Sequence, residues 1–200
     1  MGHPVFDHEG PWTEDAYLGL SAPDDGRVEL VDGALVVGPG ATAERVRVVA
    51  AVRAAVEAAL PDGMRVVGPV PLRMGTDCVL VPDLVVTREA EDDGDSGSVL
   101  DAADALMVIE VVGADHGALD RSFKPQLYAR SRIPYSLLVD HDVPFAVANM
   151  IIGGRYHEYA HASGHEVLRV EEPFALEIDP ASGVDQDRQP EDQDAVPAGG

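Results

Sequence analysis

Two carboxylates stand in segments that are otherwise apolar: Asp83 in VLVPDLVV and Glu110 in LMVIEVV. A carboxylate buried among Val, Leu and Ile costs several kcal/mol in lost hydration unless it is paired, protonated or bound to a cation. The ordinary partner is an arginine, and for either acid alone Arg88 or Arg121 would serve. Two such acids, with Glu29 as a third in the apolar run RVEL, favour one shared site.

Lys124, in SFKPQLYAR, is the only lysine among the 14 Lys and Arg residues of the chain. Lysine is a compact point charge whose pKa can fall on burial, which suits it to holding or activating a water. Because Pro125 is tolerated only in the first turn of a helix, we expect a helix that begins at about Arg121 or later. Lys124 then lies in or beside the first turn of the helix that follows the Glu110 segment.

Three carboxylates and one lysine at a sheet edge suit a hard cation such as Mg²⁺, which takes oxygen ligands and keeps several waters. A bound metal makes its water easier to deprotonate and offsets charge on a phosphoryl oxygen. In that arrangement Lys124 would orient the attacking water or stabilise a pentavalent phosphorane.

The elements that must position these residues can be predicted from periodicity. RVEL and ALVV about Asp32-Gly33 predict a β-hairpin, preceded by a short helix that contains Tyr17. A helix is expected over 43–60, where apolar residues recur at three- and four-residue steps. Its apolar positions are Val46, Val49, Val52, Val56 and Leu60, and the charged residues between them are Arg45, Arg47, Arg53 and Glu57.

Short β-branched runs predict the strands: MRVVG, VPLRM, VLVPDLVV, LMVIEVVG, YSLLVD and the segment 145–152. The acidic stretch EAEDDGDSGS is expected to be a solvated loop, and the last twenty residues carry too little apolar material to fold. Strands outnumber helices, and the two main helices each connect strands. The predicted fold is therefore an α/β protein with a mixed sheet.

Four blocks resemble a known family: VELVDG, VLVPDLVV, LMVIEVV and DRSFKPQLYARSRIPYSLLVD. They are similar, in this order, to the Uma-two family of restriction-endonuclease-like proteins within the PD-(D/E)XK nuclease superfamily. The resemblance implies a mixed β-sheet core flanked by helices, with an N-terminal helix and β-hairpin. We expect an N-terminal extension at 1–15, an endonuclease-like domain at 16–179 and a disordered acidic tail at 180–200.

The resemblance also implies roles for individual residues. Glu29, Asp83, Glu110 and Lys124 match the catalytic positions of the family, with Lys124 as its displaced lysine. Asp83, Glu110 and Val111 match the positions that hold Mg²⁺ or Mn²⁺.

Two further residues and several departures concern the same site. Asp120 and Tyr128 flank Lys124 by one turn on either side and are expected to help orient it. The family usually has a histidine after the first hairpin, where ATAER offers Glu44 and Arg45 instead. Gly113-Ala114-Asp115 replaces a Ser-Pro-Ser type turn, and Pro125 directly after the lysine is unusual.

Composition limits the classes of function. With 200 residues, 46% of them hydrophobic, the chain can bury a real core, and its net charge of −22 argues against a broad basic surface for nucleic acid. A nucleic-acid function must therefore use a local cleft. One cysteine, Cys78, excludes an internal disulfide. Without a signal peptide or an apolar run of ~20 residues, we expect a cytoplasmic protein that makes no membrane contact.

Three hypotheses follow. The first is a Mg²⁺-dependent endonuclease that hydrolyses DNA phosphodiester bonds at Asp83, Glu110, Glu29 and Lys124. The second is a catalytically inactive nuclease-fold protein that acts as a homodimeric interaction module. The third, a carboxylate-pair hydrolase of sugars, would need two acids of divergent pKa but no lysine or metal.

Overall fold

The computed structural model describes residues 10–20, 26–38, 40–89, 99–113 and 119–184. Almost all of the predicted acidic loop at 89–98 and most of the last twenty residues lie outside these ranges. Among the helices that the structure describes, none combines the length and the apolar character needed to cross a bilayer.

Three α-helices and thirteen strands make up the described fold, which confirms the predicted α/β class. The helices are α1 (Glu14–Leu18), α2 (Ala43–Ala59) and α3 (Lys124–Arg130), with a 3₁₀ turn η2 (Ala102–Asp104) and a π-helical turn η3 (Leu119–Phe123). The strands are β1 (Arg27–Val31), β2 (Ala34–Gly38), β3 (Met64–Val67), β4 (Leu72–Gly75), β5 (Cys78–Leu80), β6 (Leu84–Arg88), β7 (Leu100–Asp101), β8 (Ala105–Val112), β9 (Tyr135–Asp140), β10 (Phe145–Ile152), β11 (Arg155–Ser163), β12 (Leu168–Val170) and β13 (Leu176–Ile178).

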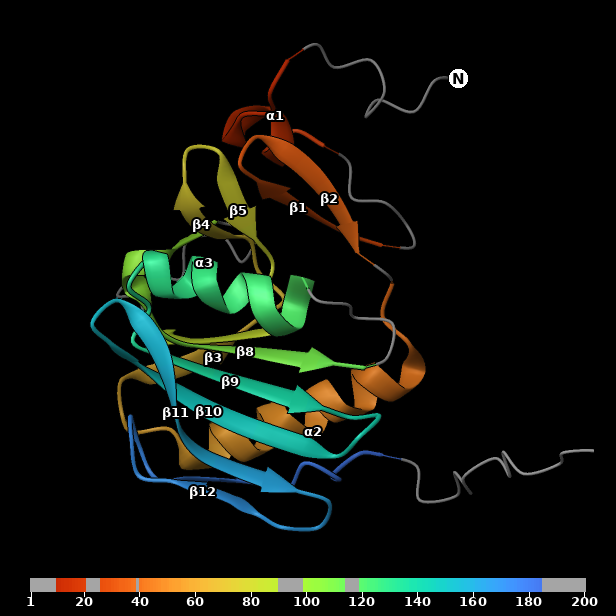
Figure 1. The fold of residues 1–200 in the computed structure, drawn as a ribbon, viewed down its shortest axis with the longest axis vertical. Coiled ribbons are helices and arrows are strands. Elements are labelled where there is room, and N and C mark those ends of the chain that lie inside the picture. Colours follow the sequence, from red (N-terminus) through yellow and green to blue (C-terminus); the bar gives the residue numbers. More distant parts are fainter. Residues whose placement is uncertain (1–9, 21–25, 39, 90–98, 114–118, 185–200) are drawn as a thin grey trace, which may run out of the picture.

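Two larger sheets lie on either side of α3 (Figure 1). One has six strands in the order β11-β10-β9-β8-β6-β3, and the other has five in the order β2-β1-β5-β4-β7. Helix α2 covers the opposite face of the six-stranded sheet, next to the small β12-β13 sheet (Figure 1). Helix α3 is thus enclosed between the two larger sheets, and the site described below lies beside it.

The predicted hairpin is confirmed. Strands β1 and β2 pair antiparallel with Val31 opposite Ala34, and Asp32 and Gly33 both take positive φ values, +48° and +76°. Positive φ at both turn residues is the geometry that a two-residue type I′ turn needs. The turn fixes the register of β1, so that Leu30 faces α1 while Glu29 faces α3.

Strand β8 alternates in the same way, with each face packed against a different helix. Ile109 and Val111 belong to the core cluster beneath α2, and Val108 belongs to the cluster around α3. Period-two alternation therefore places the Glu110 side chain on the α3 side of the sheet. A strand covered on both faces explains why its sequence is apolar throughout except at this one position.

Helix α2 has the predicted extent but a different buried face. Val52 and Val56 are buried as expected, whereas Val46 is 55% exposed and Arg45 is only 4% exposed. The sequence pattern counted Arg45 among the charged residues between the apolar positions and did not predict that its side chain would be buried. Arg45 lies on the same face as the fully buried Val48, one turn along, because its guanidinium finds acceptors inside the protein.

Candidate active site

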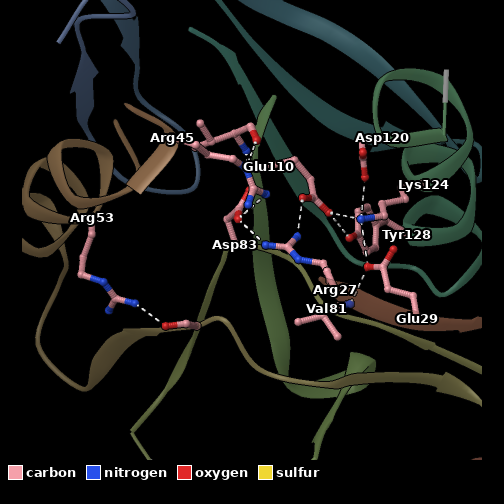
Figure 2. A network of polar contacts seen from close by, with 12 residues as sticks. Arg27, Glu29, Arg45, Arg53, Val81, Asp83, Glu110, Asp120, Lys124 and Tyr128 are labelled. Carbon is pink, nitrogen blue, oxygen red and sulfur yellow. Dashed lines mark hydrogen bonds and ion pairs between the residues drawn. The ribbon is translucent and has the colours of Figure 1, made fainter. Parts of the chain in front are cut away.

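Lys124, the first residue of α3, is almost entirely buried, with 1% of its surface exposed. Its Nζ lies 2.6 Å from Asp120 Oδ1, 2.9 Å from Glu29 Oε1 and 3.5 Å from Glu110 Oε1. Three carboxylates from β1, β8 and the turn before α3 thus surround one ammonium, which has three N–H donors (Figure 2). Pro125 sits in the first turn as predicted, where no backbone N–H is needed.

Lys124 keeps its proton in this environment. Burial lowers its pKa, but the attraction of Glu110, Glu29 and Asp120 outweighs burial and leaves the pKa above its ordinary value. The amine therefore acts as a fixed positive charge and a hydrogen-bond donor. The expectation that this lysine could also lose its proton is not supported by its surroundings.

Glu110 is the carboxylate most perturbed by burial. Desolvation raises its pKa to about 7, with Lys124 opposing the rise and Asp83 adding to it. Tyr128 donates its hydroxyl to Glu110 Oε1 at 2.5 Å, and its own pKa is raised by burial, so the phenol stays protonated. Tyr128 thus holds Glu110, and Asp120 is the neighbour that holds Lys124 directly.

Glu29 reaches the cluster from the five-stranded sheet. Its Oε1 accepts a hydrogen bond from the backbone N–H of Val81 at 2.8 Å in addition to the Lys124 ammonium. Val81 lies in the link between β5 and β6, directly before Pro82 and Asp83. The Glu29 carboxylate therefore connects β1 to the segment that carries Asp83.

Asp83 lies immediately before β6, and both of its oxygens are occupied by donors (Figure 2). Oδ1 accepts from Arg27 and from Arg45, each at 2.6 Å, and Oδ2 accepts from Arg45 at 2.8 Å and from the backbone N–H of Val111 at 2.7 Å. The Nε of Arg45 also donates to the Val111 carbonyl at 2.9 Å. Arg27 extends to Glu110, with 3.7 Å between Nη1 and Oε2.

The structure brings all four residues predicted to be catalytic into one network, in which Arg27 joins the Asp83 half to the Glu110 half. The predicted arginine partners were wrong. Neither Arg88 nor Arg121 contacts these acids through a hydrogen bond or ion pair within the described residues, and Arg121 pairs instead with Asp140. Sequence reasoning missed Arg27, whose place at the start of the hairpin strand that carries Glu29 was the available signal.

The charges of the network nearly cancel without any ion. Four buried carboxylates face three cations, which leaves one excess negative charge when every group is ionised. Partial protonation of Glu110 near neutral pH reduces that excess further. The acids are Glu29, Asp83, Glu110 and Asp120, and the cations are Arg27, Arg45 and Lys124.

The predicted metal ligands do not fit a divalent ion as they lie. A carboxylate offers about four lone-pair positions, and Asp83 uses four with its two arginines and the Val111 N–H. Val111 can offer an ion only its carbonyl, which already accepts from Arg45. Glu110 Oε2 alone keeps room for a further partner, so the three-ligand set is incomplete in this arrangement.

A separate group of possible ligands lies at the end of β8. Glu44, His141 and Asp142 bring one ligand atom each within 4.8 Å of one another. Gly113 makes room for them, because a Cβ there would come 2.5 Å from His141 Nε2 and 2.9 Å from an Asp142 oxygen. Sequence reasoning did not find this group, because Glu44 lies nearly a hundred residues before the adjacent His141 and Asp142 in the chain.

A pocket of about 720 Å³ opens beside the network, between α3 and strands β9, β10 and β11. Of the four residues predicted to be catalytic, Glu110 alone lines it, together with Asp120 and Tyr128. The pocket wall also includes three arginines and one more acid: Arg121, Arg130, Arg155 and Glu158. This is a local, mixed-charge cleft on a chain whose net charge is −22.

The site thus combines a mixed α/β fold with a buried carboxylate–lysine network. The structure is similar to a solved protein from Anabaena variabilis ATCC 29413, described as a "putative nuclease belonging to DUF820". The two share 17% sequence identity, with a TM-score of 0.66 over 86% of this chain and 97% of the other. At this identity the likeness establishes the fold. No curated protein matches the chain.

The family follows from the sequence match. Residues 14–181 match the Uma2 family, described as "Putative restriction endonuclease", and the chain belongs to that family. The resemblance read from the four sequence blocks is thereby confirmed.

Proposed function

We propose that this protein hydrolyses phosphodiester bonds in DNA at the Glu29, Asp83, Glu110 and Lys124 network. One observation carries the proposal: a buried Lys124 is held among carboxylates from three separate elements, and two of these, Glu110 and Asp120, line a cleft. Catalysis of phosphoryl transfer needs fixed positive charge where the transition state is negative, and Lys124 supplies it.

The residues would divide the reaction as follows. Lys124 lies behind Glu110, with 3.5 Å between Nζ and Oε1, and would give up this longest of its three contacts to donate a hydrogen bond to the attacking water or to a phosphoryl oxygen. Glu110 takes the proton of the water at Oε2, since Oε1 is already engaged by Tyr128 and a pKa near 7 suits a general base. The water oxygen bonds to phosphorus as the bond to the leaving oxygen breaks, and the leaving oxygen takes a proton from solvent in the cleft. Arg27, 16% exposed at its side chain, provides a second cation for the phosphate.

Mg²⁺ or Mn²⁺ belongs to this proposal as the expected cofactor, with Asp83, Glu110 and Val111 as its predicted ligands. When bound, such an ion would neutralise phosphoryl charge and polarise water. The arginine contacts on Asp83 and Val111 oppose its binding.

Nicking of supercoiled plasmid, with Mg²⁺, Mn²⁺ or EDTA present, tests the proposal. We expect Glu110→Gln to lower the rate at least about 100-fold, as loss of a general base does. The control is Glu177→Gln, which removes a 65% exposed carboxylate on β13 and should cleave like wild type. Equal rates for wild type and Glu110→Gln would contradict the proposal and indicate a contaminating nuclease.

A second candidate is favoured by the same arginine contacts. If Arg27 and Arg45 neutralise Asp83 permanently, the chain is a catalytically silent nuclease-fold protein that acts through interactions, with a homodimer as the predicted form. Wild-type protein that leaves plasmid intact under every condition, yet sediments as a dimer, would support this candidate. The ammonium in the network disfavours the sugar hydrolase, which has no use for it.

A further inference from the structure

The Arg45 guanidinium lies against the two groups, Asp83 and the Val111 carbonyl, that the proposed function assigns to a divalent ion. We propose that Arg45 is a built-in replacement for that ion, and that the site accepts a divalent cation only when this side chain leaves Asp83. The inference rests on the proposed function for the location of the site. It concerns how the site is closed.

Arg45 contacts the same groups that a bound ion would contact. Nη2 of Arg45 meets both Asp83 oxygens, at 2.6 and 2.8 Å, while Nε of the same planar group donates to the Val111 carbonyl at 2.9 Å. A divalent ion bridging these groups would use the same oxygens. The rigid fork of arginine can satisfy acceptors on two elements at once, which a lysine ammonium on a flexible stem does less well.

Arg45 is also more deeply buried than Arg27, the other arginine on Asp83. Arg45 is 4% exposed and is fixed at its backbone by the Thr42 cap, whose hydroxyl accepts from the Arg45 N–H at 3.1 Å. The Arg27 side chain is 16% exposed, against 5% for the Arg45 side chain, and it belongs to the first residue of β1, so it is held less closely. Of the two arginines on Asp83, Arg45 is therefore the one that controls access.

The charge balance of the network also opposes a divalent ion while Arg45 is in place. The four carboxylates already face three fixed cations, so a divalent ion added to the intact network would produce an excess of positive charge in a buried space. Without the Arg45 charge, the four carboxylates face two cations, which leaves two excess negative charges for a divalent ion to neutralise. The substitution should then convert a network that resists a divalent ion into one that binds it.

Calorimetric titration with Mn²⁺ tests the proposal on wild type, Arg45→Gln and a matched control, Arg53→Gln. Arg53 lies on the same helix and donates to the carbonyls of Val66 and Gly68, but it contacts no carboxylate of the network. We expect Arg45→Gln to bind Mn²⁺ at least about tenfold more tightly than wild type and Arg53→Gln. Each protein is also titrated with the additional substitution His141→Asn. Mn²⁺ binding that this substitution removes is assigned to the Glu44, His141 and Asp142 group.

Thermal unfolding provides a readout independent of activity. Arg45→Gln should melt below wild type in EDTA, because Asp83 loses a partner, and Mn²⁺ at about 1 mM should raise its melting temperature more than that of wild type. If Arg45→Gln is unfolded in EDTA, recovery of a cooperative transition with Mn²⁺ supports the proposal equally. Failure of Mn²⁺ to restore folding would overturn it.

The remaining outcomes separate this inference from the proposed function. Wild type that binds Mn²⁺ as tightly as Arg45→Gln overturns the inference and leaves metal-dependent hydrolysis intact. Folded proteins that all fail to bind Mn²⁺ overturn both the inference and the expected metal. Plasmid nicking by wild type decides on hydrolysis separately.

Discussion

At the scale of single residues, the molecule places two cations where water cannot solvate them. Lys124 and Arg45 are 1% and 4% exposed, and each is compensated by carboxylates within hydrogen-bond distance. The two differ in what they contact. Lys124 contacts acids only, whereas Arg45 also contacts backbone at Val111, so its position depends on the strand as well as on charge.

Loss of the Lys124 charge should destabilise the protein strongly. Lys124→Met keeps the volume but leaves Glu29, Asp120 and Glu110 facing one another, and we expect a loss of about 3–5 kcal/mol in the free energy of unfolding. Urea denaturation measures it. Arg169→Met is the control, since Arg169 pairs with Glu177 at the surface and its loss should cost less than about 1 kcal/mol. Similar losses in both variants would contradict the buried network.

Glu110 should give stability a pH dependence near neutrality. Its folded pKa of about 7 lies above the ordinary value of 4.5, so its contribution is complete below pH 4.5 and is lost as the pH rises through 7. Glu110→Gln cannot titrate. Between pH 6 and 8 we therefore expect wild type to lose about 1 kcal/mol relative to this variant, measured by urea midpoints. Parallel pH profiles would show that Glu110 has an ordinary pKa.

The acids of the network and Lys124 were predictable from sequence, and the arginine partners Arg27 and Arg45 were not. A carboxylate in an apolar run is visible in the sequence because its neighbours reveal the burial, and Asp83 and Glu110 both met this criterion. A partner arginine has no such signal. Arg45 stands between Glu44 and Val46 near the start of an amphipathic helix, where long charged side chains ordinarily face solvent. Only the folded position of Asp83 shows why it turns inward.

At the scale of elements, the face that α2 buries can be tested directly. Val48 is fully buried and Val46 is 55% exposed, although the sequence pattern placed Val46, and not Val48, on the apolar face. We expect Val48→Ala to cost about 2 kcal/mol through lost burial and a small cavity, and Val46→Ala to cost nearly nothing. Urea denaturation of the two variants compares them under identical conditions. A larger loss of stability in Val46→Ala than in Val48→Ala would show that the helix buries the face predicted from the sequence.

Gly68 positions the segment that carries Asp83. A Cβ at Gly68 would lie 2.2 Å from the Asp83 carbonyl oxygen, and its φ of +139° already disfavours a side chain. Gly154 also has a positive φ, +80°, but a Cβ there meets nothing within 4 Å. Gly68→Ala should therefore destabilise by at least about 2 kcal/mol more than Gly154→Ala, measured by urea denaturation. Equal costs would mean that backbone strain alone matters at both positions.

Most of the helices and strands around the site could be predicted from local sequence signals. The Asp32-Gly33 hairpin, the extent of α2, the apolar β8 and the placement of Pro125 in the first turn of α3 were all predictable. The π-helical turn η3 before α3 was not, because nothing in its sequence distinguishes it from an ordinary helical start. That turn matters, since it presents Asp120 to Lys124.

At the scale of the whole molecule, the net charge of −22 should make stability depend on salt. Self-repulsion destabilises a compact chain of high net charge, and salt screens it, so we expect the free energy of unfolding to rise by on the order of 1 kcal/mol from about 20 to 300 mM NaCl. Tetramethylammonium chloride at equal ionic strength should act alike if screening is the cause. A fall in stability with salt would show that attractive surface ion pairs outweigh the repulsion.

The enclosure of α3 between two sheets has one more consequence. Glu29 comes from the five-stranded sheet and Glu110 from the six-stranded sheet, and Lys124 pairs with both (Figures 1 and 2). The polar network therefore also links the two sheets. A ligand that draws Lys124 or Arg27 toward itself must weaken this link. Amide hydrogen exchange in β1 and β5 would then become a remote reporter of events in the cleft, readable without following any reaction.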